Sequence, residues 1–374
     1  MAEPLVNQFG ADVPQAIARM VAAVYPRFES ARFVRDALQG YDALALMPRG
    51  KHIARALHRH LPAGFAQAVE ILIASLDQPH GRPAGLSMAS FLYLPHTEFV
   101  AQFGLDHFED SMRAQHALTQ RFTAEFSIRA FLQKHEAATL ARLKQWATDP
   151  SDHVRRLVSE GSRPRLPWAS RLPAFQKNPA PVLALLELLK DDPALYVRRS
   201  VANNLNDIGK DHPELLAKTA KQWLKGATDE RRWIVQHALR SAVKRGEAGA
   251  LDVLGFGKSA EVAVSDARIT PKRVLMGEKV HIGFDVTNTS PKAQRVLVDF
   301  CIHYVKASGK SSAKVFKLKV LDLAPGEKAK LGKTVSTAEM TTRKHHAGRH
   351  RVDVLLNGQA QALGSFELMA AVTT

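Results

Sequence analysis

The sequence predicts a mainly α protein: a HEAT-like α-solenoid followed by a C-terminal all-β sandwich of the immunoglobulin type. Two observations predict this class: a helical repeat in the first two thirds of the chain, and a change to a hydrophobic period of two near residue 260. The segments DPSDHVRRLVSEG (149–161) and DPALYVRRSVANN (192–204) begin 43 residues apart, a spacing typical of HEAT-type helical arrays. A weaker third copy begins at Asp229.

The helical prediction depends on apolar positions that recur in register. In the second copy Val197, Val201, Leu205 and Ile208 have the spacing of one helix face, which predicts a stripe buried against neighbouring helices. The corresponding positions of the first and third copies are also apolar: Val154, Val158, Ile234 and Ala238.

A polar row accompanies the apolar stripe on another helix face. Arg199, Asn203 and Asp207 recur every fourth residue in the second copy. The equivalent rows in the other copies consist of Arg156 and Glu160, and of Gln236, Arg240 and Lys244. We expect these rows to form an outward-facing surface of the solenoid, lined by guanidiniums, amides and two carboxylates.

The sandwich is predicted from alternation. Apolar residues occupy every second position over 280–286 and again over 296–302, which is typical of half-buried strands. Turn signals separate about seven such segments, as in an immunoglobulin-like domain, although the chain has no cysteine pair to join two sheets. We expect a helical domain over 1–258 and a sandwich over 259–374, with LGFGK (254–258) as the linker.

Composition bounds the partners. The 374 residues are 45% hydrophobic, enough for buried cores, and carry a net charge of +16. Residues 262–374 contain 18 Lys and Arg against 9 Asp and Glu, so the smaller domain is the more basic one. A basic helical array is a platform for a polyanion, and nucleic acid is therefore the first expected partner.

Other features predict the compartment. One cysteine, Cys301, is expected to pack as a small apolar residue in a strand. The N-terminal MAEPLVNQFG lacks a secretory pattern and no apolar run reaches the length of a membrane span, so a reduced, cytoplasmic protein is expected. The histidines of KHIARALHRH (51–60) and KHHAGRH (344–350) have no suitably spaced cysteine or carboxylate, and we interpret both groups as basic surface, with no metal and no cofactor.

Three longer segments resemble a known family. FTAEFSIRAFL (122–132), HVRRLVSEGSRPRLPWASRLP (153–173) and DDPALYVRRSVANNLNDIGKDHP (191–213) closely resemble the AlkC family of bacterial 3-methyladenine DNA glycosylases. The order of helical array and immunoglobulin-like domain is similar to that of family members with the extra domain. The resemblance implies a monofunctional glycosylase that removes cationic alkylated bases from duplex DNA without base flipping and so starts base excision repair. It implies 3-methyladenine as the substrate, with 3-methylcytosine as a second candidate, and a monomer near the bacterial nucleoid.

The resemblance also implies site residues. Glu125, Glu160 and Asp207 match the acidic positions of the AlkC-type site, and Trp168 matches its aromatic residue. Base hydrolysis passes through an oxocarbenium-like sugar, which carboxylates stabilise while they position water. The residues expected to bind DNA are Arg156, Arg163, Arg165, Arg199, Asn203, Arg240, Lys244, Lys310 and Lys314.

Several alternatives remain at the level of sequence. The carboxylates could be ordinary ion-paired residues, with Arg156 and Arg199 in reach on their own helices. Trp168 could fill the core, but the prolines at 164 and 167 favour an exposed position for it. Two other functions are a non-catalytic HEAT-repeat nucleic-acid-binding protein and a protein-binding scaffold with a basic surface.

Overall fold

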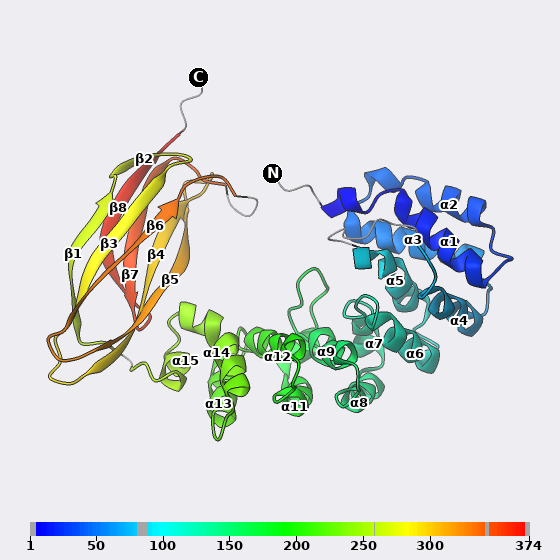
Figure 1. Cartoon of the computed structure of the whole chain (residues 1–374), viewed down its shortest axis with the longest axis horizontal. Helices are drawn as coiled ribbons and strands as arrows, with labels where there is room; N and C mark the ends of the chain where they lie inside the picture. The colour runs from blue at the N-terminus through cyan, green and yellow to red at the C-terminus, as the bar shows by residue number, and fades with distance from the viewer. Residues whose placement is uncertain (1–4, 81–88, 258, 341–343, 371–374) are drawn as a thin grey trace. The chain divides into compact units, whose positions relative to one another are not determined.

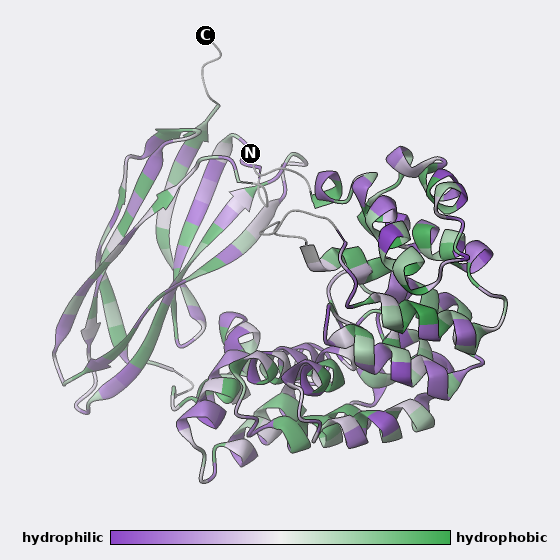
Figure 2. Ribbon diagram, turned by 45° about the vertical axis from the view of Figure 1, so that its right-hand side comes forward, coloured by the Kyte–Doolittle hydropathy of each residue, from purple (hydrophilic) through white to green (hydrophobic). Residues whose placement is uncertain are grey.

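The fold class expected from the sequence is confirmed: a helical array precedes a two-sheet sandwich (Figure 1). The computed structural model describes residues 5–80, 89–257, 259–340 and 344–370. The chain forms two compact units, one of residues 2–211 and 227–238, the other of residues 212–226 and 239–374. Apolar residues recur along one side of the helices and alternate along the strands (Figure 2).

The secondary structure described in the first unit is helical. Its α-helices are α1 (Asp12–Val24), α2 (Ser30–Leu38), α3 (Leu46–His60), α4 (Phe65–Ser75), α5 (Leu94–Phe103), α6 (Phe108–Thr119), α7 (Ile128–Lys134), α8 (Glu136–Trp146), α9 (Asp152–Gly161), α10 (Pro173–Lys177), α11 (Ala180–Leu189) and α12 (Leu195–Ile208). Three 3-10 helices accompany them: η1 (Leu5–Gln8), η2 (Tyr41–Ala43) and η3 (Ala89–Tyr93). The helices α13 (Pro213–Trp223), α14 (Asp229–Lys244) and α15 (Ala248–Val253) follow, and α14 runs from the first unit into the second.

The apolar stripe of the repeats is buried as predicted. Val197, Val201 and Leu205 of α12 are fully buried, as are Val154 and Val158 of α9. Each such side chain stabilises the fold by roughly 1.5–3 kcal/mol relative to exposure. Asn204 adds a polar link, because its amide donates to the Ser159 carbonyl of α9 over 2.7 Å. The stripe therefore places α9 and α12 side by side.

The expected outward position of the polar row is wrong for its carboxylates. Glu160 is 5% exposed and Asp207 only 1%, whereas Arg199 is exposed. The loop 162–172 between α9 and α10 covers both acids and inserts Arg163 between them. Helical spacing cannot anticipate a covering loop, since the loop lies outside the helices that show the spacing.

The sandwich has two sheets of described strands. One sheet has the order β1-β3-β6, all antiparallel, and the other has the order β2-β8-β7-β4-β5, with β2 parallel to β8. The strands are β1 (Val262–Thr270), β2 (Arg273–Leu275), β3 (Lys279–Asn288), β4 (Gln294–Val305), β5 (Ser311–Leu323), β6 (Lys328–Ser336), β7 (Gly348–Leu356) and β8 (Gln359–Met369). The alternation predicted about seven strands; the three-residue β2 is too short to show a period. Phe284, Phe300 and Phe366 fill the space between the sheets.

Strand β4 differs from the expected half-buried strand, because both of its faces are covered. Leu297, on its outer face, packs with Leu251 of α15 and with Phe256, so the segment expected to be a plain linker is anchored to the sandwich. A bulge between Val298 and Asp299 lets the Asp299 carboxylate accept the Leu318 N–H over 3.2 Å. Burial raises the pKa of this carboxyl. Cys301 is buried, as predicted.

The interpretation of the histidine groups as basic surface is wrong for His345 and His350, whereas His58 of the first group is exposed. His350 is fully buried, with its ring 5.5 Å from that of Tyr304 and 5.1 Å from that of Phe366, and burial lowers its pKa. His345 is also buried, and His60 pairs with Asp36 over 2.9 Å. The alternation of β7 turns His350 into the core, which histidine composition alone cannot reveal. Among the described helices, none is long and apolar enough to cross a membrane.

Candidate active site

Two of the three predicted carboxylates line one pocket of the helical unit. Glu125 precedes α7 and Glu160 lies in the last turn of α9, and both face a pocket of about 430 Å³. Asp207, in the last turn of α12, lies behind Arg163 and does not reach the pocket wall. The three segments are far apart in sequence. Packing of α9 against α12 brings Glu160 and Asp207 together, and Arg156 of α9 joins Glu125 to Glu160.

Arg156 joins the two carboxylates of the pocket. Its guanidinium contacts Glu125 directly, and its Nη2 lies 3.5 Å from Glu160 Oε1. The guanidinium also stacks 5.2 Å above the ring of Tyr196. Burial by itself lowers the pKa of Arg156, but the charges of Glu125 and Glu160 more than offset it and hold the pKa above its ordinary value. Arg156 is therefore a permanent cation at the pocket wall.

Arg163 joins Glu160 to Asp207. Its Nη1 donates to Glu160 over 2.6 Å and its Nε donates to Asp207 over 2.8 Å. Ser200 donates to the second oxygen of Glu160 over 2.6 Å, and Lys210 donates to the second oxygen of Asp207 over 2.7 Å. Burial by itself lowers the pKa of Arg163, but the charges of Glu160 and Asp207 more than offset this effect and raise the pKa above its ordinary value. Every predicted catalytic carboxylate thus has a cationic partner.

Trp168 projects from the loop over these ion pairs. Its side chain is 64% exposed and lines the pocket, so the expectation of an exposed tryptophan is confirmed. The residue has φ +64°, a left-handed conformation that costs an L-residue about 1–2 kcal/mol. Leu166 anchors the loop in the core, and Leu172 N–H closes it by donating to the Pro164 carbonyl over 3.1 Å. The loop holds an aromatic face outward at an energetic cost, which is common at functional sites.

Aromatic side chains that the sequence prediction missed form the rest of the pocket wall. Phe91 and Phe122 meet edge to face with ring centroids 4.9 Å apart, and Phe126 and Tyr196 complete the wall. One signal was available: Phe122 and Phe126 stand four residues apart around Glu125. Such faces attract cations through their π-electrons, so the wall is suited to a positively charged ring.

The residues predicted to bind DNA belong to both units. Arg165 pairs with Asp211, Arg199 is exposed, and Asn203 lies 3.3 Å from His237. The remaining four belong to the second unit: Arg240 is half-buried, Lys244 and Lys310 are exposed, and Lys314 lies 5.2 Å from the ring of Phe316. Only Arg156 and Arg163 line the pocket.

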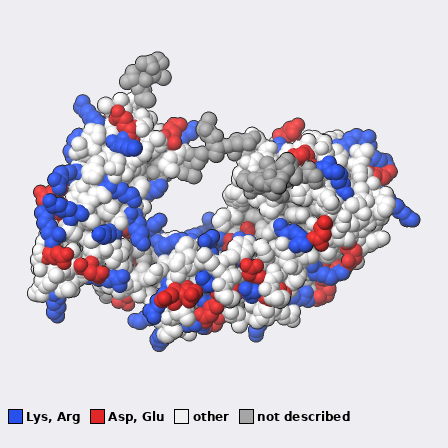
Figure 3. Space-filling model, in the orientation of Figure 1, with Lys and Arg blue, Asp and Glu red and all other residues white. Residues whose placement is uncertain are grey.

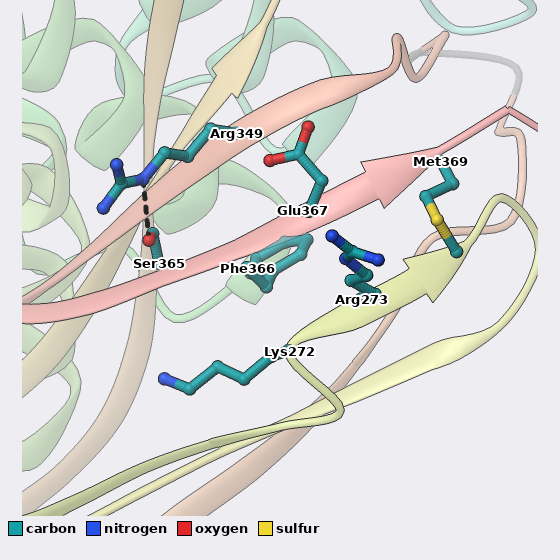
Figure 4. A pocket seen from close by; sticks show the side chains of 7 residues that line it. All are labelled: Lys272, Arg273, Arg349, Ser365, Phe366, Glu367 and Met369. Atoms are coloured by element: carbon teal, nitrogen blue, oxygen red, sulfur yellow. Dashed lines mark hydrogen bonds between the residues drawn. The ribbon is translucent and has the colours of Figure 1, made fainter.

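The sandwich has a cationic pocket of its own, which the sequence prediction also missed. Figure 4 shows Arg349 of β7, Arg273 of β2 and the preceding Lys272 around Ser365 and Glu367 of β8. The pocket measures about 500 Å³, and Arg349 donates to Ser365 over 2.9 Å. Lys and Arg outnumber acidic side chains on the sandwich face seen in Figure 3. Three cations and one carboxylate give the pocket a net positive charge, which attracts phosphate groups.

The fold and the site together define a helical-repeat protein that has an acid- and arginine-lined pocket and an immunoglobulin-like C-terminal domain. Alkylpurine DNA glycosylase AlkC of Pseudomonas fluorescens, solved bound to DNA containing an abasic site analog, is 40% identical, with a TM-score of 0.91 over 98% of this chain and 100% of that one. The chain belongs to the AlkC family. Uncharacterized protein YhaZ of Bacillus subtilis (strain 168) is 38% identical over 349 residues, which are 93% of this chain and 94% of the relative. Residues 263–370 match the family "Uncharacterised protein YhaZ, C-terminal Ig-like domain".

Proposed function

We propose that this protein is a DNA glycosylase that hydrolyses the N-glycosidic bond of cationic alkylated purines in DNA. The observation that carries the proposal is the pocket in which Glu125, Glu160 and Arg156 lie beside the exposed Trp168. The similarity to an alkylpurine DNA glycosylase supports it, at 40% identity over nearly the whole chain. The proposed substrate is duplex DNA with 3-methyladenine, and 3-methylcytosine is a second candidate base.

The proposed mechanism uses the charge that already exists on the lesion. A cationic base is a good leaving group, so the protein has to stabilise an oxocarbenium-like sugar and direct a water to it. Glu125 and Glu160 face the pocket and would provide the negative charge. Asp207 is 1% exposed, and it reaches the sugar only if Arg163 turns from it toward a DNA phosphate. Arg163 keeps an ion pair in this exchange, because its guanidinium leaves a carboxylate and binds a phosphate.

Base recognition is proposed to occur at the pocket surface. Trp168 and the aromatic wall offer π-faces to a cationic ring while the base remains in the duplex, so no deep pocket for an extruded nucleotide is required. This is the physical basis for proposing excision without base flipping. The reaction on this proposal is hydrolysis alone, by a cytoplasmic monomer, with no cofactor.

The sandwich is proposed to contact the DNA backbone. Its excess of basic residues and the pocket at Lys272, Arg273 and Arg349 support this role, together with the exposed Lys310 and Lys314. The proposed domains are residues 1–258, the helical domain that carries the reaction, and residues 259–374, the sandwich domain.

The test is incubation of the purified protein with methylated duplex DNA, followed by identification of released bases by mass spectrometry. Release of 3-methyladenine is expected, and Asp207→Asn serves as the matched control. A non-catalytic DNA-binding protein is the second candidate, favoured by the full ion pairing of the carboxylates. That candidate predicts salt-sensitive binding with no release of any base.

A further inference from the structure

Arg129 is a buried cation whose hydrogen bonds go to backbone carbonyls. It lies on α7, directly after the segment that bears Glu125, and is 2% exposed. Its Nη1 donates to the carbonyls of Gly161 (3.0 Å) and Arg163 (2.8 Å), and its Nε donates to that of Ser170 (3.0 Å), which Nη2 also contacts. Among the described residues no carboxylate forms an ion pair with it, so carbonyl dipoles are the direct partners of its charge.

The three carbonyls lie at the two ends of one loop. Gly161 ends α9, Arg163 lies near the start of the loop 162–172, and Ser170 lies near its end, so a single planar guanidinium spans residues 161–170. Between these contacts lie Arg163, which bridges Glu160 and Asp207, and Trp168 at the pocket mouth. Both side chains therefore lie on the segment whose two ends Arg129 joins.

Two further features concern the surroundings of Arg129: the close approach of α7 to the end of α9, and the pKa of the guanidinium. Gly161 has no Cβ, and a Cβ there would lie 2.5 Å from Ile128 Cγ2, so only glycine lets α7 approach the end of α9. Burial, and next the charge of Arg163, lower the pKa of Arg129 to about 10, while the charges of Glu125, Asp207 and Glu160 act in the opposite direction. The guanidinium remains charged at neutral pH.

We propose that Arg129 is the positioning residue of the candidate active site, which holds the loop 162–172 so that Trp168 and Arg163 face the lesion. The catalytic part of this inference rests on the proposed glycosylase function. Arg129 touches neither the pocket nor a reacting atom, and it acts through the loop. Lysine keeps the charge at this position but lacks the planar fork that reaches three carbonyls together.

The chain offers a matched control in Arg49 of α3. This guanidinium is also buried and also donates to backbone carbonyls, those of Val6, Phe9, Asp42 and Leu44, at 2.7–3.3 Å. None of these residues lines the candidate site. Arg49→Lys therefore reproduces the loss of a buried carbonyl clamp without touching the Trp168 loop.

The first experiment needs no catalysis. Full-length wild type, Arg129→Lys and Arg49→Lys are digested briefly with chymotrypsin well below their melting temperatures, and cleavage after Trp168 is followed by mass spectrometry. We expect severalfold faster cleavage at this bond in Arg129→Lys and wild-type cleavage in Arg49→Lys. Equal cleavage in Arg129→Lys and wild type would overturn the proposal, whether or not the protein excises bases.

The second experiment is a double-mutant cycle on excision. Single-turnover rates at saturating enzyme are compared for wild type, Arg129→Lys, Trp168→Ala and the double variant, with Arg49→Lys as control. We expect Arg129→Lys to slow excision about 10- to 100-fold, Arg49→Lys to leave it unchanged, and the double variant to lose less than the product of the single losses. Losses that multiply, or a wild-type rate for Arg129→Lys, contradict the proposal. Absence of base release by wild type contradicts the proposed function instead, and the digestion still decides the role of Arg129.

Discussion

Replacement of Trp168 separates its role in the site from any role in stability. The residue is 64% exposed, so Trp168→Ala leaves almost no cavity, and the loss of 3–5 kcal/mol expected for a core tryptophan should not occur. Alanine keeps a Cβ at φ +64° and therefore keeps the backbone strain. Glycine removes it, because both signs of φ are accessible to a residue without a Cβ.

The magnitudes follow from these two facts. The left-handed conformation costs an L-residue about 1–2 kcal/mol, and glycine loses about 0.5–1 kcal/mol more entropy on folding. We therefore expect Trp168→Gly to be more stable than Trp168→Ala by up to about 1.5 kcal/mol. Both variants lose the stacking and cation–π contribution of roughly 1–2 kcal/mol, and excision should be slower by about tenfold in each.

The assay combines thermal melts of wild type, Trp168→Ala and Trp168→Gly with single-turnover excision of methylated duplex DNA. The expected pattern is a melting temperature that is nearly unchanged in alanine and higher in glycine than in alanine, with the same slow excision in both. A large drop in the melting temperature of Trp168→Ala, with unchanged turnover by the folded protein, would refute the reasoning.

Three other perturbations test the carboxylates, the sandwich and a buried histidine. Asp207→Asn removes the charge of the side chain and preserves its shape. Single-turnover excision should therefore fall about a hundredfold or more, while DNA affinity stays unchanged or rises. A near-wild-type rate for the double variant Asp207→Asn, Glu160→Gln would eliminate the carboxylate mechanism. Joint replacement of Lys272, Arg273 and Arg349 by Gln should reduce the slope of log DNA affinity against log salt concentration by about one for each phosphate that these cations no longer neutralise. The matched control replaces three lysines of the other sheet by Gln: Lys279, Lys330 and Lys333. Equal slopes for the pocket variant and wild type would show that the pocket does not bind the DNA backbone. Point substitutions suit this test better than truncation near residue 260, which would uncover Leu251 and Phe256. His96 is fully buried, and burial lowers its pKa from 6.5 to about 4, so the unfolded chain takes up a proton first as the pH falls. The contribution of His96 to the free energy of unfolding should therefore be fully present above pH 6.5 and decrease by about 3 kcal/mol by pH 4. In urea unfolding, His96→Leu should show a correspondingly smaller loss of stability over this pH range.

Periodic features of this protein could be predicted from the sequence alone. Val154, Val158, Val197 and Val201 are buried as their spacing indicates, because helix and strand periods are set locally by backbone geometry. The change of period near residue 260 predicts the sandwich for the same reason. The segments that carry Glu125, Glu160, Asp207 and Trp168 were also identified, by resemblance to a family, and the exposure of Trp168 followed from its neighbouring prolines.

The tertiary structure decided which side chains meet. Glu160 and Asp207 were expected on an open surface, yet the loop 162–172 buries both and pairs them with Arg163, which is 44 positions from Asp207 in the chain. His350 was expected on a basic surface, yet it is fully buried in the sandwich. Burial and ion pairing depend on segments that are distant in sequence, and no local period contains that information. The helices are predicted by the local sequence. The ion pairs of Arg163 with Glu160 and Asp207, in contrast, form only when the loop 162–172, which Arg129 holds, packs over the carboxylates.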